Sequence, residues 1–354
     1  MLGNRKLVLD TFCEVRDLID SMADDSFWDF TKHTLIPGAV YLFGRTQFTT
    51  HVEQIKQLAR DGIILPVLSN PAEGSDTMRW QLICLDVLDL VEQGKILVIT
   101  GGFLPDSIPS LYYENFMPKL LDYKENIAAQ QEYKHRWTTD RPYKYLFLNG
   151  RGRQHRKFLL DNLDKSCAIW TNLDAAIGPV KLLDPKYEYD EYKNNLTTVV
   201  DDGFVKYQLF NNRWGEIYLK PEPYLDTYFS LVTETVFDYP YTFRTEKIWK
   251  PICIGHPWIV AGNIGYYRDI RNIGYRTFDH LIDESFDTID DFNDRLNRII
   301  AVVEDLCKQD LASFITAAQD ICKYNQQHLA ELSIQVRKEF PQQFIKFINE
   351  RSRV

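Results

Sequence analysis

The chain has 354 residues, a net charge of −9 and an apolar share of 45%. This length favours two domains over a single domain with one core. The acidic net charge disfavours a protein that binds nucleic acid through an overall positive electrostatic field. No stretch approaches the roughly 18 apolar residues of a membrane span, and the six cysteines are scattered without a C-x-x-C pair. Such cysteines are typical of free thiols in a reducing compartment, so we expect a cytoplasmic protein.

The first part of the chain alternates between short apolar runs, which have the length of buried strands, and segments with helical spacing. The expected strands are 39–44, 63–68 and 95–100, and the expected helices are 51–60 and 78–92. Strands and helices that alternate in this way predict a parallel sheet with right-handed crossovers.

A second region of the same kind begins at residue 143. The apolar run 143–150 predicts a strand, and a basic turn, Arg151-Gly152-Arg153-Gln154-His155-Arg156, leads from it into a helix at 157–163. Arginines at the start of a helix favour an anion, because the backbone N–H groups and the helix dipole add to their charge. A solvated basic turn is the alternative. We place the domain boundary near residue 140.

The segment 228–278 combines charged residues with apolar runs. Val232-Thr233-Glu234-Thr235 ends a strand, Thr245-Glu246-Lys247-Ile248-Trp249-Lys250 has the spacing of a helix start, and another apolar strand follows at 257–261. Charges at strand ends and helix starts lie where α/β sheets bind ligands. From spacing alone, Glu246 and Lys250 would form a surface ion pair. From 287 on the chain is almost entirely helical, and Phe340-Pro341 is expected to break its last stretch.

These motifs together resemble the donor-binding region of the α1,3-fucosyltransferases, where a strand with a Glu-Asn pair precedes a Thr-Glu-Lys helix start and a Gly-x-x-Pro-Val-Val strand. They are also similar to fucosyltransferase-like and exostosin-like proteins of bacteria and phages. The matching pieces are the turn 149–156, the helix start 246–251 and the segment 274–278. The resemblance covers roughly residues 143–300. This chain has Thr235 where the family has Asn, so GDP-fucose does not follow as the donor.

The resemblance implies an α/β fold of the GT-B type, with two Rossmann-like domains that face each other across a cleft. The expected parts are an N-terminal acceptor domain at 1–140, a donor domain at 141–287, and C-terminal helices at 288–354 that pack at least partly on the first domain. It implies a glycosyltransferase that moves a sugar from a nucleotide-diphosphate sugar to an acceptor hydroxyl, with a glycan as the expected acceptor.

The resemblance also assigns site residues. By position, Arg156 would meet the diphosphate, Lys247 the phosphates, and Glu246 the hydroxyls of the ribose or the sugar. The full set of expected donor-binding residues is Arg153, Arg156, Glu234, Thr235, Glu246, Lys247 and Lys250. Arginine and lysine can neutralise a departing diphosphate, and the sequence has no Asp-x-Asp motif; its nearest approach is Glu188-Tyr189-Asp190. We therefore expect inverting transfer without a metal or a cofactor.

The general base is expected in the N-terminal domain. Glu73, Asp106 and Glu114 are candidates, with an ordinary surface carboxylate as the alternative for each. We favour Glu114 and Asp106, because they follow the Gly101-Gly102 turn at the end of a strand. Two other functions stay open: the same fold acting on a modified base of phage DNA, which the acidic net charge disfavours, and a non-catalytic GT-B fold that binds a glycan or a partner.

Overall fold

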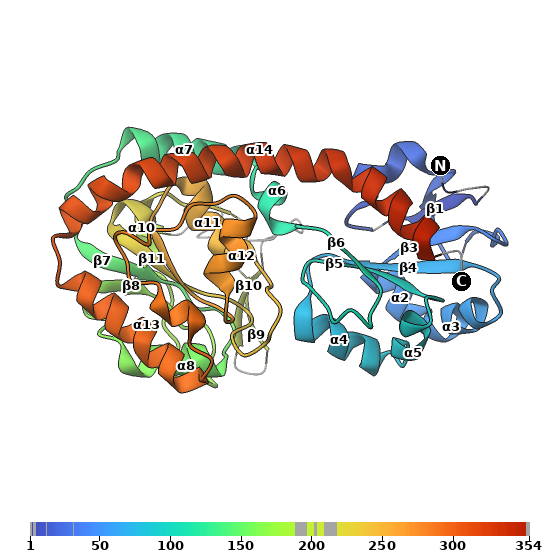
Figure 1. Cartoon of the computed structure of the whole chain (residues 1–354), viewed down its shortest axis with the longest axis horizontal. Helices are drawn as coiled ribbons and strands as arrows, with labels where there is room; N and C mark the ends of the chain where they lie inside the picture. Colours follow the sequence, from blue (N-terminus) through green and yellow to red (C-terminus); the bar gives the residue numbers. More distant parts are fainter. Residues whose placement is uncertain are drawn as a thin grey trace. The chain divides into compact units, whose positions relative to one another are not determined.

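The computed structural model of the protein describes residues 2, 5–11, 13–30, 32–187, 197–201, 204–208 and 218–351. The chain forms two compact units. The first unit is Met1–Asn115 together with Leu332–Val354, and the second is Phe116–Glu331. Each unit contains one parallel sheet with helices packed around it (Figure 1). The prediction of an α/β chain with parallel sheets is thus confirmed.

The first unit is built on a six-stranded sheet. Its strands are β1 (Leu7–Asp10), β2 (Asp25–Trp28), β3 (Val40–Gly44), β4 (Leu65–Asn70), β5 (Leu97–Thr100) and β6 (Ser110–Tyr112). Its helices are α1 (Arg16–Ile19), a 3₁₀ turn at Asp20–Met22, α2 (Arg45–Thr50), α3 (Val52–Arg60), α4 (Ser75–Cys84), α5 (Leu88–Glu92) and the last part of α14 (Leu311–Arg351). The strand order is β2-β1-β3-β4-β5-β6, and all pairs are parallel.

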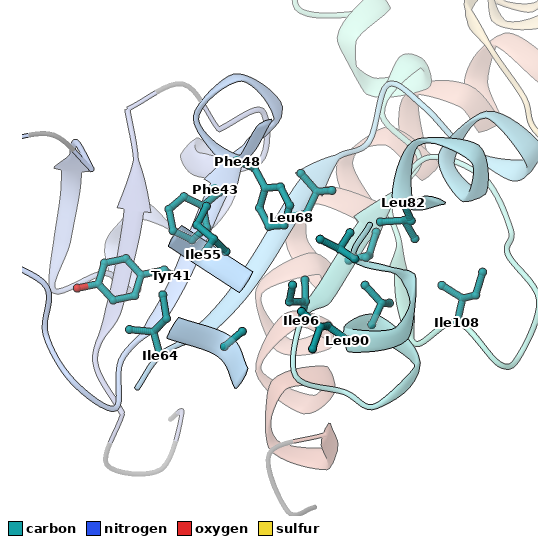
Figure 2. Close-up of a cluster of buried hydrophobic side chains, with 14 of the residues drawn as sticks. Tyr41, Phe43, Phe48, Ile55, Ile64, Leu68, Leu82, Leu90, Ile96 and Ile108 are labelled. Atoms are coloured by element: carbon teal, nitrogen blue, oxygen red, sulfur yellow. The ribbon is translucent and has the colours of Figure 1, made fainter. Parts of the chain in front are cut away.

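Alternate residues of each strand point to opposite faces of the first sheet. Both faces are buried, because each packs against helices. On one face, Tyr41, Phe43 and Leu68 pack with side chains of α2 to α5 (Figure 2). On the other face, strand residues pack against α1 and against four residues of α14. These four are Phe340, Phe344, Phe347 and Ile348. The end of the chain therefore completes the core that its beginning starts.

Two predicted features of the helices are wrong. The expected helix 78–92 is two helices, α4 and α5, because Asp86 between them has a φ of +53° and cannot continue a helix. Its carboxylate accepts from the Lys56 ammonium at 2.8 Å, which holds this turn to α3. Pro341 does not break the last helix, since α14 runs through it to Arg351. Buried side chains on both sides of the proline, Phe340 and Phe344, fix this part of the helix in the core.

The second unit is built on a four-stranded sheet. Its strands are β7 (Tyr143–Phe147), β8 (Ala168–Trp170), β11 (Thr227–Thr233) and β12 (Trp258–Ala261), and an antiparallel pair, β9 (Thr197–Asp201) and β10 (Phe204–Gln208), forms a separate ribbon. Its helices are α6 (Phe116–Leu120), α7 (Lys124–His135), α8 (Gln154–Asn162), α10 (Glu222–Leu225), α11 (Glu246–Ile254), α12 (Tyr266–Asn272), α13 (Phe292–Cys307), the first part of α14, and 3₁₀ turns at Pro185–Tyr187 and Ser285–Thr288.

The second sheet has the order β12-β11-β7-β8, with all pairs parallel. The chain leaves β7 toward one edge and later returns beside it with β11, so the strand order reverses between these two central strands. The unit begins at residue 116, before the boundary expected near 140, because α6 and α7 pack on α11. No helix in the described part of the chain is both long enough and apolar enough to cross a bilayer.

Candidate functional site

The carboxyl ends of β7 and β11 lie side by side where the order of the second sheet reverses. In open α/β sheets such a switch point is where ligands bind. The turn after β7 leads into α8, and Glu234 and Thr235 directly follow β11. The amino end of α11 reaches the same place, because the carboxylate of Glu234 binds Thr245, the residue before this helix. Two helix starts and two strand ends thus meet here.

Glu234 is the centre of this arrangement. Its carboxylate is fully buried and accepts hydrogen bonds from the Thr245 backbone N–H at 3.1 Å, the Thr245 hydroxyl at 2.6 Å and the Tyr266 hydroxyl at 3.0 Å. It also accepts from the backbone N–H of Thr235 at 3.3 Å. The four hydrogen bonds hold this buried carboxylate in one orientation, and the positive amino end of α11 stabilises its negative charge. Glu234 therefore fixes α11 against β11.

The backbone carbonyl of Glu234 is held from the other side by α8. It accepts from His155 Nε2 at 3.0 Å and from the Arg156 guanidinium at 3.0 Å. The same guanidinium donates to the carbonyl oxygens of Thr233 at 2.9 Å and Arg151 at 2.6 Å. Arg156, which is only 3% exposed, thus binds three carbonyl oxygens, one in the turn after β7 and two at the end of β11. These contacts make Arg156 a residue that positions the end of β11. The contact with a diphosphate that the resemblance implies stays a prediction.

Burial lowers the pKa of both His155 and Arg156. It lowers the pKa of His155 to about 3, with the neighbouring Arg156 charge adding to the effect, so the ring is neutral at pH 7. The His155 ring also stacks on Phe237, with centroids 5.1 Å apart. Burial lowers the pKa of Arg156 to about 10, and the charge of Arg153 adds to this. Arg156 therefore remains cationic at pH 7 within a largely buried site.

The first turn of α11 presents a cation closer to the surface. Thr245 caps this helix, and the Lys247 ammonium donates to the Thr245 hydroxyl at 3.1 Å and to Glu246 Oε1 at 2.6 Å. It also lies 3.4 Å from the Thr235 hydroxyl. The side chain of Lys247 is 27% exposed, that of Glu246 only 9%. Burial opposes ionisation of Glu246, but the charges of Lys247 and then Lys250 outweigh it and bring the pKa of Glu246 below its usual value.

The start of α8 differs from that of α11. Arg153 occupies its N-cap position, and among the described residues no side chain caps the first turn. The N–H groups of an uncapped first turn need an outside acceptor, such as water or an anion. The preceding turn is held in shape by Asp174, which accepts from the Gly152 N–H at 2.6 Å. A Cβ at Gly152 would lie 2.7 Å from Ile177, so only glycine fits at this close approach.

Asn149 is a site residue that the sequence did not single out. It lies in the turn after β7 and is 1% exposed, and its Oδ1 accepts from the Thr233 hydroxyl at 2.8 Å. Its Nδ2 has no hydrogen-bond partner in the described part of the chain. A buried amide donor without a partner costs free energy, about 1–3 kcal/mol, and such groups point to function or to an unseen water or ligand. The only sequence signal was its position directly after a strand.

The remaining predicted residues lie in different surroundings. Thr235, Arg153 and Lys250 are half-buried around the two helix starts. Of the candidate bases, Asp106 is exposed in the loop after β5, whereas Glu114 follows β6, is 5% exposed and accepts from the Tyr112 hydroxyl. Both belong to the first unit, as does the half-buried Glu73 after β4. Glu188-Tyr189-Asp190 lies outside the described residues.

No group of three or more histidine, cysteine, aspartate or glutamate side chains with metal-binding geometry occurs within the described ranges. Comparisons of the chain with protein-family models, with curated proteins and with solved structures find no match. What the site can do chemically therefore has to be argued from its own groups: two helix amino ends, a partly exposed ammonium and a buried amide donor.

Proposed function

We propose that the protein is a glycosyltransferase of GT-B type that holds the diphosphate of a nucleotide sugar at the switch point of its second sheet. The observation that carries the proposal is the meeting of the uncapped start of α8 with the Lys247-bearing start of α11 beside β7 and β11. Helix amino ends and lysine favour phosphate oxygens. The sugar-transfer part of the proposal rests on the motif resemblance of the same segments.

In this proposal each group has one task. The first-turn N–H groups of α8, with Arg153 beside them, and the Lys247 ammonium bind phosphate oxygens and neutralise the charge that develops on the departing diphosphate. Glu246, oriented by Lys247 at 2.6 Å, accepts from hydroxyls of the ribose or the sugar. Glu234, His155 and Arg156 hold these groups in place from within the unit. No step requires a bound metal ion.

The proposal is tested by thermal shift with GDP, UDP, CDP and ADP and with their sugars, each with and without EDTA. A nucleotide at 100 times its dissociation constant should stabilise the unit that binds it by about 2.7 kcal/mol. The absence of any shift would contradict nucleotide binding, and loss of the shift in EDTA would contradict metal independence. A nucleotide sugar that binds but releases no nucleoside diphosphate with any glycan acceptor would leave the non-catalytic alternative.

A variant locates the site. Lys247→Gln removes the charge but keeps an amide that can donate to Glu246, so the unliganded protein should melt within a few degrees of the wild type. The nucleotide-dependent shift should fall to near zero. Lys323→Ala is the matched control, since this lysine is 67% exposed on α14 and pairs only weakly, at 3.8 Å, with Asp320. If both variants keep the full nucleotide shift, the phosphates bind elsewhere.

A further inference from the structure

Two free cysteines of the second unit, Cys167 and Cys307, lie together at the amino end of its sheet. Cys167 directly precedes β8, and Cys307 is the last residue of α13. Lys144, at the start of β7, binds both: its backbone N–H donates to the Cys167 carbonyl at 2.7 Å, and its ammonium donates to the Cys307 carbonyl at 2.9 Å. The end of α13 is therefore held beside the starts of β7 and β8.

The two thiols are in direct contact through a hydrogen bond between their side chains. Burial raises the pKa of both thiols, that of Cys307 to about 12. The hydrogen bond itself lowers the pKa of Cys167 and raises that of Cys307 further, so the Cys307 S–H donates and the Cys167 sulfur accepts. Contact between two sulfur atoms is the first geometric requirement of a disulfide, whose S–S bond is about 2.05 Å long.

The surroundings of the pair suit thiol chemistry. The Cys167 thiol donates to the Asp164 carbonyl at 3.7 Å, and the Tyr145 hydroxyl donates to the same oxygen at 2.6 Å. The charge of Lys144 favours the thiolate form of both cysteines. Both are half-buried, so a small solute can reach them from solvent. Within the described ranges no third histidine, cysteine or carboxylate joins them in metal-binding geometry.

We propose that Cys167 and Cys307 form a dithiol site that reacts with a low-molecular-weight disulfide, such as oxidised glutathione, and closes reversibly into an intramolecular disulfide. The Cys167 thiolate attacks one sulfur of the oxidant, forms a mixed disulfide and releases one thiolate. Cys307 then loses its proton and attacks the Cys167 sulfur, which displaces the second thiolate. The two protein thiols are oxidised, the oxidant is reduced to two thiols, and the two cysteine protons end on these.

The disulfide joins two distant parts of the second unit. Only residues 308–310 separate α13 from α14, so the bond fastens the junction of these helices to β8. A crosslink across so long a stretch of chain restricts the unfolded state, and the oxidised unit should unfold less readily. The proposed phosphate site lies at the opposite, carboxyl edge of the same parallel sheet. Oxidation should therefore leave nucleotide binding unchanged, and the dithiol site does not depend on it.

The test uses the full chain, reduced, freed of reductant and incubated with oxidised glutathione. After N-ethylmaleimide blocks the remaining thiols, peptide mass spectrometry should find Cys167 bonded to Cys307. Backbone amides of β7 and β11 should exchange hydrogen at least about tenfold more slowly, and dithiothreitol should reverse this. Glutathione retained on either cysteine without a bond between them, or bonds among other cysteines only, would overturn the dithiol site. A Cys167–Cys307 bond that leaves the exchange rates unchanged would overturn its fastening role.

Variants make the test specific. Cys307→Ser keeps a hydroxyl that can donate to Cys167 but cannot displace glutathione, so Cys167 should retain the mixed disulfide and the slower exchange should be lost. Cys167→Ser should likewise lose the slower exchange. Cys84→Ser is the matched control, because Cys84 is an exposed cysteine on α4 of the first unit, and it should form the Cys167–Cys307 bond like the wild type. Loss of the bond in the Cys84 variant, or slower exchange on oxidation of the Cys307 variant, would contradict the assignment.

Discussion

The carboxyl edges of the two sheets differ in chemistry although both units are parallel α/β sheets whose order reverses beside their first strand. The edge of the second sheet gathers cations around two helix starts, with Arg153, Lys247 and Lys250 near the surface. The edge of the first sheet carries Glu114 and Asp106 with a stacked aromatic pair, Phe103 and Tyr112. The aromatic pair lies at the ends of β5 and β6, whereas the order of the first sheet reverses between β1 and β3. The two edges therefore differ both in their side chains and in their place relative to the switch point.

The two buried carboxylates sharpen this difference. Glu234 accepts four hydrogen bonds from its own unit, and these bonds hold a helix start in place. Glu114 accepts from the hydroxyl of the neighbouring Tyr112 at the edge strand. Glu234 is therefore part of the scaffold of the second unit.

The largest effect is expected from removing residues 332–354. The first unit would lose four buried side chains of α14, and a single buried Phe→Ala change already costs about 3–5 kcal/mol, which is comparable with the whole stability of a domain. Hydrogen exchange should show β3 to β5 unprotected while β7 and β11 keep their protection. Phe344→Ala, with one of these side chains removed, should give a partial loss in the first unit only. Full protection of β3 to β5 in the truncated chain would show that the first unit does not need α14.

A smaller effect should separate the two carboxylates. Glu234→Ala leaves the Thr245 N–H, the Thr245 hydroxyl and the Tyr266 hydroxyl without their acceptor, so unfolding of the second unit should become easier by about 3 kcal/mol. In Glu114→Ala, loss of the hydrogen bond from the Tyr112 hydroxyl should contribute only about 1 kcal/mol, because this hydroxyl is half-buried and can turn to water. Chemical denaturation followed by unit-specific hydrogen exchange measures both. A loss well below 1 kcal/mol in Glu234→Ala would contradict its role in holding the start of α11.

The third prediction concerns acid. Burial lowers the pKa of His155 and of His256 to about 3, against 6.5 for a free histidine, and both rings belong to the second unit. Between these values the unfolded chain binds protons that the folded unit does not, so its stability falls as the pH drops from about 6.5 to 3, by roughly 1 kcal/mol per pH unit for each ring. Above pH 6.5 the two rings add no pH dependence.

The variant His256→Gln tests this assignment. Glutamine can still donate to the Thr227 carbonyl and accept from the Ser230 hydroxyl, the two partners of His256, so the fold should persist. The unfolding free energy of the second unit is measured at several pH values. Below pH 6.5 it should depend on pH less steeply than in the wild type, by the contribution of about one proton. A slope that matches the wild type would mean that His256 is protonated in the folded unit.

The sequence predicted the strands whose residues are buried on both faces of the sheet. The apolar runs of β3, β4 and β5 are readable because strands buried on both faces contain few polar residues. The strand β1, next to the edge strand β2, was not predicted, since its four residues, LVLD, follow a charged and polar start. The split of α4 from α5 depends on the backbone of Asp86 and its bond to Lys56, which the helical spacing of the neighbours does not reveal.

For the candidate site, the sequence indicated a place more reliably than roles. Parallel strands end at the same edge, so Arg156 and Glu234 could be expected near each other. Their tasks could not, because the carbonyl oxygens that Arg156 binds at Thr233 and Glu234 lie 77 and 78 residues further along the chain. The exposure of Lys247 also follows from tertiary packing, as does the burial of Asn149 Nδ2 without a hydrogen-bond partner among the described residues.

The division of α14 between the units also bears on how the protein is made. Synthesis runs from the N-terminus at about 5–20 residues per second, and domains usually fold in that order. Here Phe116–Glu331 is complete before the ribosome has produced Phe340, Phe344, Phe347 and Ile348, on which one face of the first sheet depends. The first 115 residues therefore expose an apolar face of their sheet while the later unit is synthesised and folds. Nascent chains of this protein are expected to need chaperone protection at their beginning until the last helix emerges.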